Sequence, residues 1–218
     1  MIEQILPSVA ASAEAYADLP GTALFPEEEA MLTRAVDGRR REFTTARGCA
    51  RRALAALGMA PVPILRGERG APQWPPGFVG SITHCAGYRA AAVARAGDVL
   101  TIGLDAEPSE NLPEDVLELV SLPAERARLR DLTDAAPGIC WDRLLFSAKE
   151  SVFKAWFPLA RRWLDFTEAD ITINPTDGTF RAQLLVEAPL VGDLPLTGFS
   201  GRWLVGNGLN LTAITTQV

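Results

Sequence analysis

The order of helical and strand-like segments constrains the fold of this chain more than any other feature. A helical pattern runs from Phe25-Pro26 to Leu57, with an interruption at Asp37-Gly38 and a stop at Gly58. Strand-like segments follow at 79–83, 89–95 and 99–105. Helices grouped before strands in this way favour an α+β fold.

The same order occurs again in the C-terminal part. Helical stretches cover 111–130, with a break at Leu122-Pro123, and about 140–158. Strand-like segments follow at 170–174, 179–187, 202–205 and 209–215, and the last two flank the hairpin signal Asn207-Gly208. We therefore predict two α+β halves of similar plan, residues 1–100 and 101–218, although they share no close sequence repeat.

The composition is that of an ordinary globular protein of 218 residues, 48% hydrophobic and 22% charged. Its net charge of −6 argues against general nucleic-acid binding. Three cysteines without CxxC spacing argue against a disulfide framework or a structural zinc site. Since neither a signal-peptide pattern nor an apolar run of ~20 residues stands out, we expect a cytoplasmic protein.

Both lysines of the chain, Lys149 and Lys154, lie in one stretch of the second helical region, whereas every other basic residue except the single histidine is an arginine. Glu150 lies between them, on a helical stripe that it shares with Phe146, Phe153 and Phe157. A carboxylate on an apolar stripe is costly unless it is paired or bound to a cation. The stretch is therefore a candidate site.

A second candidate is the acidic pair Asp105 and Glu107 at the end of a predicted strand. Residues two apart in a strand share a face, so the two carboxylates are expected to point the same way. Such a pair suits Mg²⁺, which binds a few carboxylates and keeps waters and substrate phosphates. Taken alone, the pair fits a solvated strand end better than a metal site.

The pair Glu150 and Lys154 also has two interpretations. A spacing of four on a helix is typical of a surface salt bridge that contributes only ~0.3–0.5 kcal/mol. Here the surrounding residues are apolar, which indicates a buried helix. Beside Asp105 and Glu107, Glu150 becomes a candidate third metal ligand or general base.

His84, the only histidine, lies at a strand end next to Thr83 and Cys85. A nucleophilic Cys–His pair is disfavoured because adjacent residues in a strand point to opposite faces. A lone histidine is more often structural, but a phosphate contact by Thr83 and His84 fits this position better than acyl transfer.

The arginines supply candidate phosphate contacts. Arg47 and Arg51 share a helix face, and Arg66 and Arg69 lie in a glycine-flanked loop. Planar guanidinium groups suit phosphate, although most charges on a helix are simply solvated. No Walker A or GxGxxG motif is present, which argues against a P-loop or dinucleotide-binding fold. Together, the acids, arginines and histidine indicate a site in which carboxylates hold Mg²⁺ beside a polyphosphate.

Four ordered segments carry a resemblance to a known family. They are Arg66–Pro75, Gly80–Tyr88, Gly103–Pro108 and Phe146–Pro158, and the helix around 40–51 adds to them. In these segments the chain resembles the Sfp-type 4′-phosphopantetheinyl transferases, in particular the subgroup of enterobactin-synthetase component D and the mycobacterial enzyme. The resemblance covers about Phe25 to the C-terminus.

The resemblance implies a monomer of two pseudo-symmetric α+β halves with the active site in the cleft between them. Such enzymes transfer the 4′-phosphopantetheine arm of coenzyme A to a serine of an apo acyl or peptidyl carrier protein, as in polyketide, nonribosomal peptide or siderophore biosynthesis, and release 3′,5′-ADP. The N-terminal half, 1–100, would contact the coenzyme A phosphates. The C-terminal half, 101–218, would carry the metal-binding acids and the catalytic helix.

Transferred to this chain residue by residue, the resemblance assigns Mg²⁺ to Asp105, Glu107 and Glu150. Glu150, or a water that it holds, would deprotonate the acceptor serine, and Lys154 would contact the phosphates or assist proton transfer. The pyrophosphate would be held by Thr83 and His84, and the other coenzyme A phosphates by Arg47, Arg51, Arg66 and Arg69. No membrane or nucleic-acid partner is implied.

This sequence departs from the family pattern in two places. Ala106 lies in the variable middle position of the acidic motif, so a water must fill that metal position, and arginines replace lysines common at Arg66 and Arg69. Two other functions use the same residues: a coenzyme A-binding or carrier-binding protein without catalysis, and a metal-dependent phosphohydrolase. The intact set of acids and lysine disfavours the first.

Overall fold

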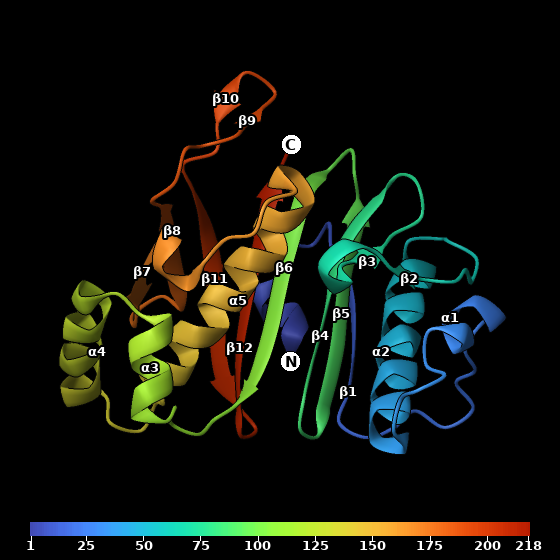
Figure 1. Ribbon diagram of the computed structural model, residues 1–218, viewed down its shortest axis with the longest axis horizontal. Coiled ribbons are helices and arrows are strands. Elements are labelled where there is room, and N and C mark those ends of the chain that lie inside the picture. The colour runs from blue at the N-terminus through green and yellow to red at the C-terminus, as the bar shows by residue number, and fades with distance from the viewer.

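Two antiparallel sheets carry the fold, and the computed structural model describes all of residues 1–218 (Figure 1). The first sheet has the strand order β1-β5-β4 and contains β1 (Ala11–Ala15), β4 (Phe78–Cys85) and β5 (Tyr88–Arg95). The second has the order β6-β12-β11-β8-β7. Its strands are β6 (Val99–Pro108), β7 (Ala169–Asn174), β8 (Thr179–Leu184), β11 (Gly198–Gly206) and β12 (Leu209–Gln217).

One long helix packs on each sheet. Helix α2 (Asp37–Ala56) covers the first sheet, and α5 (Trp141–Ala160) lies on the second (Figure 1). The apolar face of α2 repeats at helical spacing, and its buried members are Ala46, Cys49, Ala50, Ala53 and Leu54. Short helices flank the long ones: α1 (Pro26–Ala30) near α2, and α3 (Glu114–Val120) and α4 (Pro123–Ala135) beside α5. The fold is thus α+β, with a helix-on-sheet plan in each half.

The remaining elements are short. They are η1 (Ile2–Ile5), β2 (Leu65–Arg66), η2 (Glu68–Gly70), β3 (Pro72–Gln73), η3 (Phe166–Glu168), β9 (Leu190–Val191) and β10 (Leu194–Pro195). The η1 turn packs its two isoleucines into a core that it shares with β5, β6 and β12. Residues from the predicted N-terminal half therefore contribute to packing against the C-terminal sheet, and the division at residue 100 stays a prediction.

Strands β4 and β6 lie side by side at the seam between the sheets, but belong to different backbone ladders. Hydroxyl groups of β4 join them instead. Ser81 Oγ accepts the N–H of Leu104 at 3.0 Å, and Thr83 Oγ1 accepts the N–H of Ala106 at 3.1 Å. Both hydroxyls are buried, so each satisfies an edge N–H that would otherwise lack a partner.

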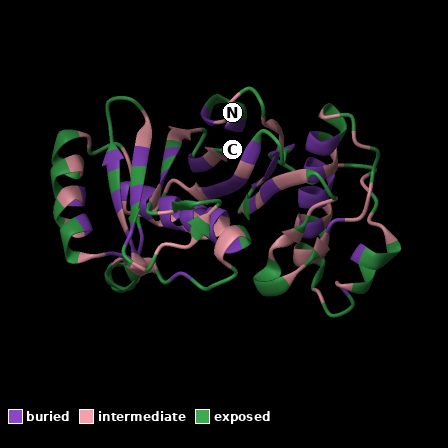
Figure 2. Ribbon diagram, turned by 90° about the horizontal axis from the view of Figure 1, so that it is seen from above, coloured by how far each residue is buried: buried purple, intermediate pink, exposed green.

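Packing around this seam requires small residues. Strand β5 is buried on both faces and uses alanine at 90, 91, 92 and 94. Gly103 of β6 lies directly under α5, where an added Cβ would be 1.9 Å from the carbonyl oxygen of Ser151. The helix backbone therefore approaches the strand too closely for any side chain there. Figure 2 shows the buried residues concentrated on the strands and the sides of the long helices that face them.

Each half fastens a short helix with a fully buried glutamate. Glu28, at the start of α1, accepts the N–H groups of Phe25 at 3.0 Å and Ile64 at 2.9 Å, and pairs with Arg51 of α2 at 2.9 Å. We call this the Glu28–Arg51 pair. It ties α1 to the long helix and to the segment that follows that helix.

The C-terminal half repeats the arrangement. Glu125, at the start of α4, accepts the N–H groups of Leu122 and Ile171, both at 2.7 Å, and pairs with Lys149 of α5 at 2.8 Å. We call this the Glu125–Lys149 pair. In both halves, an apolar residue and a proline precede the glutamate by three and two positions.

The structure confirms most predicted elements. The stop at Gly58, the break before Pro123 and the Asn207-Gly208 hairpin all occur, and Asn207 and Gly208 both have positive φ. The helix interruption predicted at Asp37-Gly38 lies earlier, at 31–36, and these two residues form the start of α2. Some predictions were wrong. No strand was predicted before Phe25, yet β1 lies there, and α5 continues past Pro158 to Ala160. No helix is long and apolar enough to cross a membrane.

Candidate active site

Helix α5 places two polar residues, Glu150 and Lys154, over the edge of β6. The core face of α5 packs on the second sheet, and the stripe of Glu150, Phe153 and Phe157 faces a pocket on the other side. The close contact at Gly103 sets the height of the helix above the strand. As a result, Lys154 Nζ reaches the carbonyl oxygen of Leu104 at 3.0 Å.

Asp105 lies at the centre of the polar site and is only 4% exposed. Its Oδ1 accepts hydrogen bonds from Lys154 Nζ at 2.6 Å and from Thr83 Oγ1 at 3.3 Å. Its Oδ2 is buried and has no hydrogen-bond partner. A buried carboxylate oxygen without a partner is unusual, and a cation is the kind of ligand that would satisfy it.

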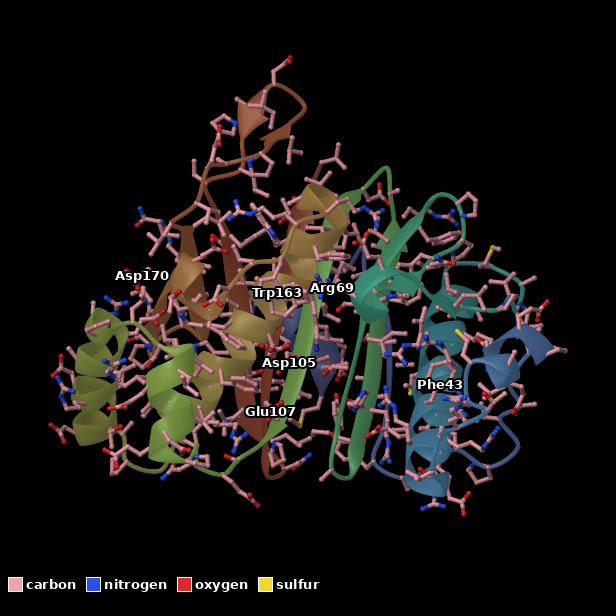
Figure 3. The ribbon with its side chains drawn as sticks, in the orientation of Figure 1. Phe43, Arg69, Asp105, Glu107, Trp163 and Asp170 are labelled. Carbon is pink, nitrogen blue, oxygen red and sulfur yellow. The ribbon has the colours of Figure 1, made fainter.

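Glu107 lies two residues further along β6 and also faces α5, so the predicted shared face of the acidic pair is confirmed (Figure 3). Its Oε2 accepts a hydrogen bond from Arg143 Nη1 at 3.1 Å. Burial, and next the charge of Asp105, raise the pKa of Glu107 to about 7, although Arg143 opposes the shift. The two carboxylates therefore destabilise each other's charge when no metal is bound.

Glu150 borders the same site from the helix. Burial raises its pKa, and the charge of Asp105 adds to this, whereas Lys154 lowers it. Lys154 pairs with Asp105 and not with Glu150, so the surface-type salt bridge considered for this spacing does not form. Both glutamates thus have a raised pKa beside one buried aspartate.

No three of these acidic or other metal-ligating side chains form a closed cluster in the structure. The chemistry of the donor set nevertheless fits a divalent cation: three acidic side chains, one of them with an unpartnered buried oxygen, and two with raised pKa values caused partly by the third. A bound cation would relieve both the missing partner and the mutual repulsion.

A pocket of about 830 Å³ opens beside Glu150 and Lys154. We call it the β4–α5 pocket, because those elements and the loop around η2 line it. Arg69 of η2, in a left-handed conformation with φ 54°, lies over the Trp163 ring, its guanidinium carbon 5.7 Å from the ring centroid (Figure 3). Trp163 in turn packs on Phe153, with ring centroids 4.7 Å apart. Residues of both halves thus meet at this pocket.

Thr83 and His84 are directed to different places. Thr83 is buried at the seam, whereas His84 contacts α2, where Nδ1 lies 3.0 Å from Glu42 and Nε2 lies 2.9 Å from Arg39. Because arginine can only donate, Nε2 is the acceptor and Nδ1 carries the proton. Burial lowers the pKa of His84, in keeping with this neutral form. The structure does not bring the two side chains to one point.

The four arginines are also in different surroundings. Arg47 is buried, donates to the carbonyl of Ile64 at 2.7 Å, and has its pKa lowered to about 10 by burial. Arg51 belongs to the Glu28–Arg51 pair. Only Arg69 lines the β4–α5 pocket, and Arg66 is exposed on the same loop. A phosphate role for Arg47 and Arg51 stays a prediction.

Two residues at the site were missed from the sequence. Arg143, which holds Glu107, lies seven residues before Glu150, a spacing that keeps both on one side of a helix and was an available signal. Trp163 follows the end of α5, and no local pattern predicts that it would meet a loop a hundred residues earlier.

Comparison with known proteins shows which family this chain belongs to. The profile of the 4′-phosphopantetheinyl transferase N-terminal domain matches residues 27–94, and that of the 4′-phosphopantetheinyl transferase superfamily matches 101–192. The 4′-phosphopantetheinyl transferase Svp of Streptomyces mobaraensis is 55% identical over 217 residues, 98% of this chain and 88% of the relative. The chain belongs to the 4′-phosphopantetheinyl transferase family.

Two further relatives support the predicted subgroup. The transferase PptT of Mycobacterium tuberculosis is 48% identical over 98% of this chain and 97% of its own length. Enterobactin synthase component D of Escherichia coli K12 is 36% identical over 58% of this chain and 59% of its own length. The resemblance found in the four segments is therefore confirmed, and this transferase combines acidic residues of β6 with Glu150 and Lys154 of α5 at its polar site.

Proposed function

We propose that this transferase moves the 4′-phosphopantetheine arm of coenzyme A to a serine of an apo carrier protein, with release of 3′,5′-ADP and dependence on Mg²⁺. One observation carries the proposal: Asp105 has an unpartnered buried Oδ2 and its charge helps to raise the pKa of Glu107 and of Glu150, and Glu150 lines a pocket together with Lys154 and Arg69. We propose a monomer that acts in the cytoplasm.

Asp105, Glu107 and Glu150 are the residues that would hold Mg²⁺. Bound there, the ion would supply positive charge to the pyrophosphate oxygens, a large contribution in phosphoryl transfer. Asp105 has a free oxygen for this role, while Glu107 is already oriented by Arg143. Ala106 adds no ligand, which leaves room for water.

Glu150 is the proposed base, directly or through a water. Burial and Asp105 raise its pKa, which makes its carboxylate a better proton acceptor than an exposed glutamate. The serine proton passes to Glu150, the serine oxygen bonds to the phosphorus that carries the pantetheine arm, and the bond from that phosphorus to the 3′,5′-ADP oxygen breaks. The positive charge of Lys154, beside the same site, would stabilise the negative charge that shifts to the leaving group.

The β4–α5 pocket is the proposed site for coenzyme A. Its volume of about 830 Å³ is in the range of small-molecule sites, and it combines a cationic entrance with aromatic walls. Arg69 and the neighbouring Arg66 offer guanidinium groups for phosphate, and His84 offers a further contact from the α2 side. The acceptor carrier must approach Glu150 from outside this pocket.

The proposal is tested by the intact mass of a purified apo carrier protein incubated with this protein, coenzyme A and Mg²⁺. We expect a mass gain of one phosphopantetheine arm, which EDTA prevents. Release of 3′,5′-ADP at full rate without a carrier would instead indicate a hydrolase. Coenzyme A binding without any product would indicate a binding protein.

Two variants localise the chemistry. Asp105→Asn and Glu150→Gln keep size and polarity and are expected to lower the transfer rate by about 10²–10⁴-fold, the usual range for a lost acid or base. Asp134→Asn, on the exposed side of α4, is the matched control and should transfer at the wild-type rate. Full activity in either site variant would overturn the assignment of that residue.

A further inference from the structure

The hydroxyl group of Thr83 lies where the seam between the sheets meets the acidic site. The side chain is only 2% exposed. Its Oγ1 lies 3.1 Å from the N–H nitrogen of Ala106, 3.3 Å from Asp105 Oδ1 and 3.5 Å from Lys154 Nζ. One oxygen atom thus contacts the backbone of β6, an acid of the proposed metal site and the lysine of α5.

These contacts use the full capacity of the hydroxyl. A hydroxyl donates one hydrogen bond and accepts two. Ala106 N–H and the Lys154 ammonium can only donate, so they occupy the two acceptor positions. The single hydrogen of Thr83 is then directed to Asp105 Oδ1.

The contacts also fix the orientation of Asp105. Its Oδ1 receives two donors, Thr83 and Lys154, while Oδ2 receives none. Because Thr83 also accepts the backbone N–H of Ala106, the next residue of β6, the Asp105 carboxylate is fixed relative to the strand that carries it. Hydrogen-bonded partners of this kind set the direction of a metal ligand, and their loss typically lowers metal affinity 10–100-fold.

We propose that Thr83 is a positioning residue that aims Asp105 Oδ2 at the metal. The inference rests on the proposed Mg²⁺ site. This role is separate from the pyrophosphate contact that family resemblance assigns to Thr83, and the two roles are measured separately, because a positioning residue changes metal binding whereas a phosphate ligand changes coenzyme A binding.

The chain provides a matched control at the same seam. Ser81 Oγ accepts the N–H of Leu104 at 3.0 Å, as Thr83 accepts that of Ala106, but it makes no hydrogen bond to Asp105. Ser81→Ala therefore removes one seam contact without touching the carboxylate. A difference between the two positions isolates the contact to Asp105 from the general effect of weakening the seam.

The experiment measures Mg²⁺ affinity by isothermal titration calorimetry for the wild-type protein, Thr83→Val, Thr83→Ser and Ser81→Ala, and coenzyme A affinity for each in parallel. For Thr83→Val we expect a rise of about 10-fold or more in the Mg²⁺ Kd measured without coenzyme A. Thr83→Ser keeps the hydroxyl and should restore the wild-type Mg²⁺ Kd, and Ser81→Ala should not change it.

Thermal unfolding of each variant establishes that it is folded. If Thr83→Val does not fold, Thr83→Cys takes its place, since a thiol is a weaker donor and acceptor of similar size, and it should raise the Mg²⁺ Kd by a smaller factor. An unchanged Mg²⁺ Kd with weakened coenzyme A binding would overturn the inference and leave the proposed function intact. A wild-type protein that binds no Mg²⁺ would overturn the metal assignment and the inference together.

Discussion

The Glu28–Arg51 pair and the Glu125–Lys149 pair neutralise a buried glutamate at corresponding places in the two halves, but with different cations. Both glutamates are fully buried, and both cap the helix that they begin and accept an N–H from the segment after the long helix. The cations differ. Arg51 remains 11% exposed, whereas Lys149 is 1% exposed.

The difference follows from the number of acceptors available. Lys149 has three donors and meets three acceptors: Glu125, the carbonyl of Phe166 at 2.6 Å and that of Ala169 at 2.9 Å. An arginine there would bring five donors into a site with three acceptors. Arg51 gives one nitrogen to both oxygens of Glu28 and another to the carbonyl of Ala23, and its side chain keeps an exposed fraction of 11%. A dry site therefore selects lysine, and a site open to water accepts arginine.

This comparison also separates the two lysines of α5. Burial lowers the pKa of Lys149, with Glu125 opposing the shift, and every donor of Lys149 is used to hold structure. Lys154, five residues later, points to Asp105 and lines the β4–α5 pocket. Lysine occurs twice in one helix for two separate reasons.

The largest expected effect is for Lys149→Met, which leaves the charge of Glu125 buried without a cation. We expect a loss of about 3–5 kcal/mol in the free energy of unfolding, the usual result of removing one partner of a buried ion pair. Urea denaturation measures it. The double variant Lys149→Met with Glu125→Gln is the control and should recover part of the loss, because no unpaired charge remains; a single-variant loss below 1 kcal/mol would contradict the comparison.

A smaller effect is expected for Arg51→Met. Glu28 keeps its two backbone donors, and water can reach the vacated position, so we expect a loss of about 2 kcal/mol in the same denaturation experiment. An effect as large as that of Lys149→Met would show that the exposure of the two cations does not decide their contribution.

Exchanging the cations sharpens the comparison further. Lys149→Arg forces extra atoms and donors into a closed site and should cost about 1–3 kcal/mol in unfolding free energy, as overpacking does. Arg51→Lys should cost about 1 kcal/mol, because one charged contact to Glu28 can be kept. Thermal and urea unfolding of the two variants side by side would reject the acceptor-count explanation if their order were reversed.

The smallest effect is expected at the exposed pair of Arg40 and Glu29, next to Glu28 in sequence. Arg40→Ala should change the free energy of unfolding by less than about 1 kcal/mol, since exposed ion pairs contribute little. Raising the salt concentration should reduce even that difference, whereas the two buried pairs should respond weakly to salt.

The sequence predicted the α+β plan and nearly all long elements, because helix periodicity, prolines and glycines are local signals. It missed β1, whose residues Ala11–Ala15 alternate between alanine and polar residues but use no β-branched or aromatic residue, and which pairs with β5. The buried glutamates were hidden for a similar reason. Their partners Ile64 and Ile171 lie far along the chain, so the weak shared pattern of proline followed two residues later by glutamate was not recognised as a repeat.

At the site, sequence reasoning found Asp105, Glu107, Glu150 and Lys154, since strand and helix spacing places them on defined faces. It did not predict that Lys154 would pair with Asp105 across the seam, that Arg143 would hold Glu107, or that Thr83 and His84 would diverge. These contacts depend on the distance between α5 and β6 and on the angle between the sheets. Tertiary packing sets both, so no local sequence pattern predicts them.

The seam between β4 and β6 has one more consequence. A backbone ladder tolerates almost any residue, because the groups that bond are the same in all of them. Here the hydrogen bonds between β4 and the backbone of β6 come from hydroxyl groups, which serine and threonine provide at 81 and 83. This part of the coupling between the two sheets is therefore inherited through two codons, so that a single nucleotide change can remove or restore one of its hydrogen bonds.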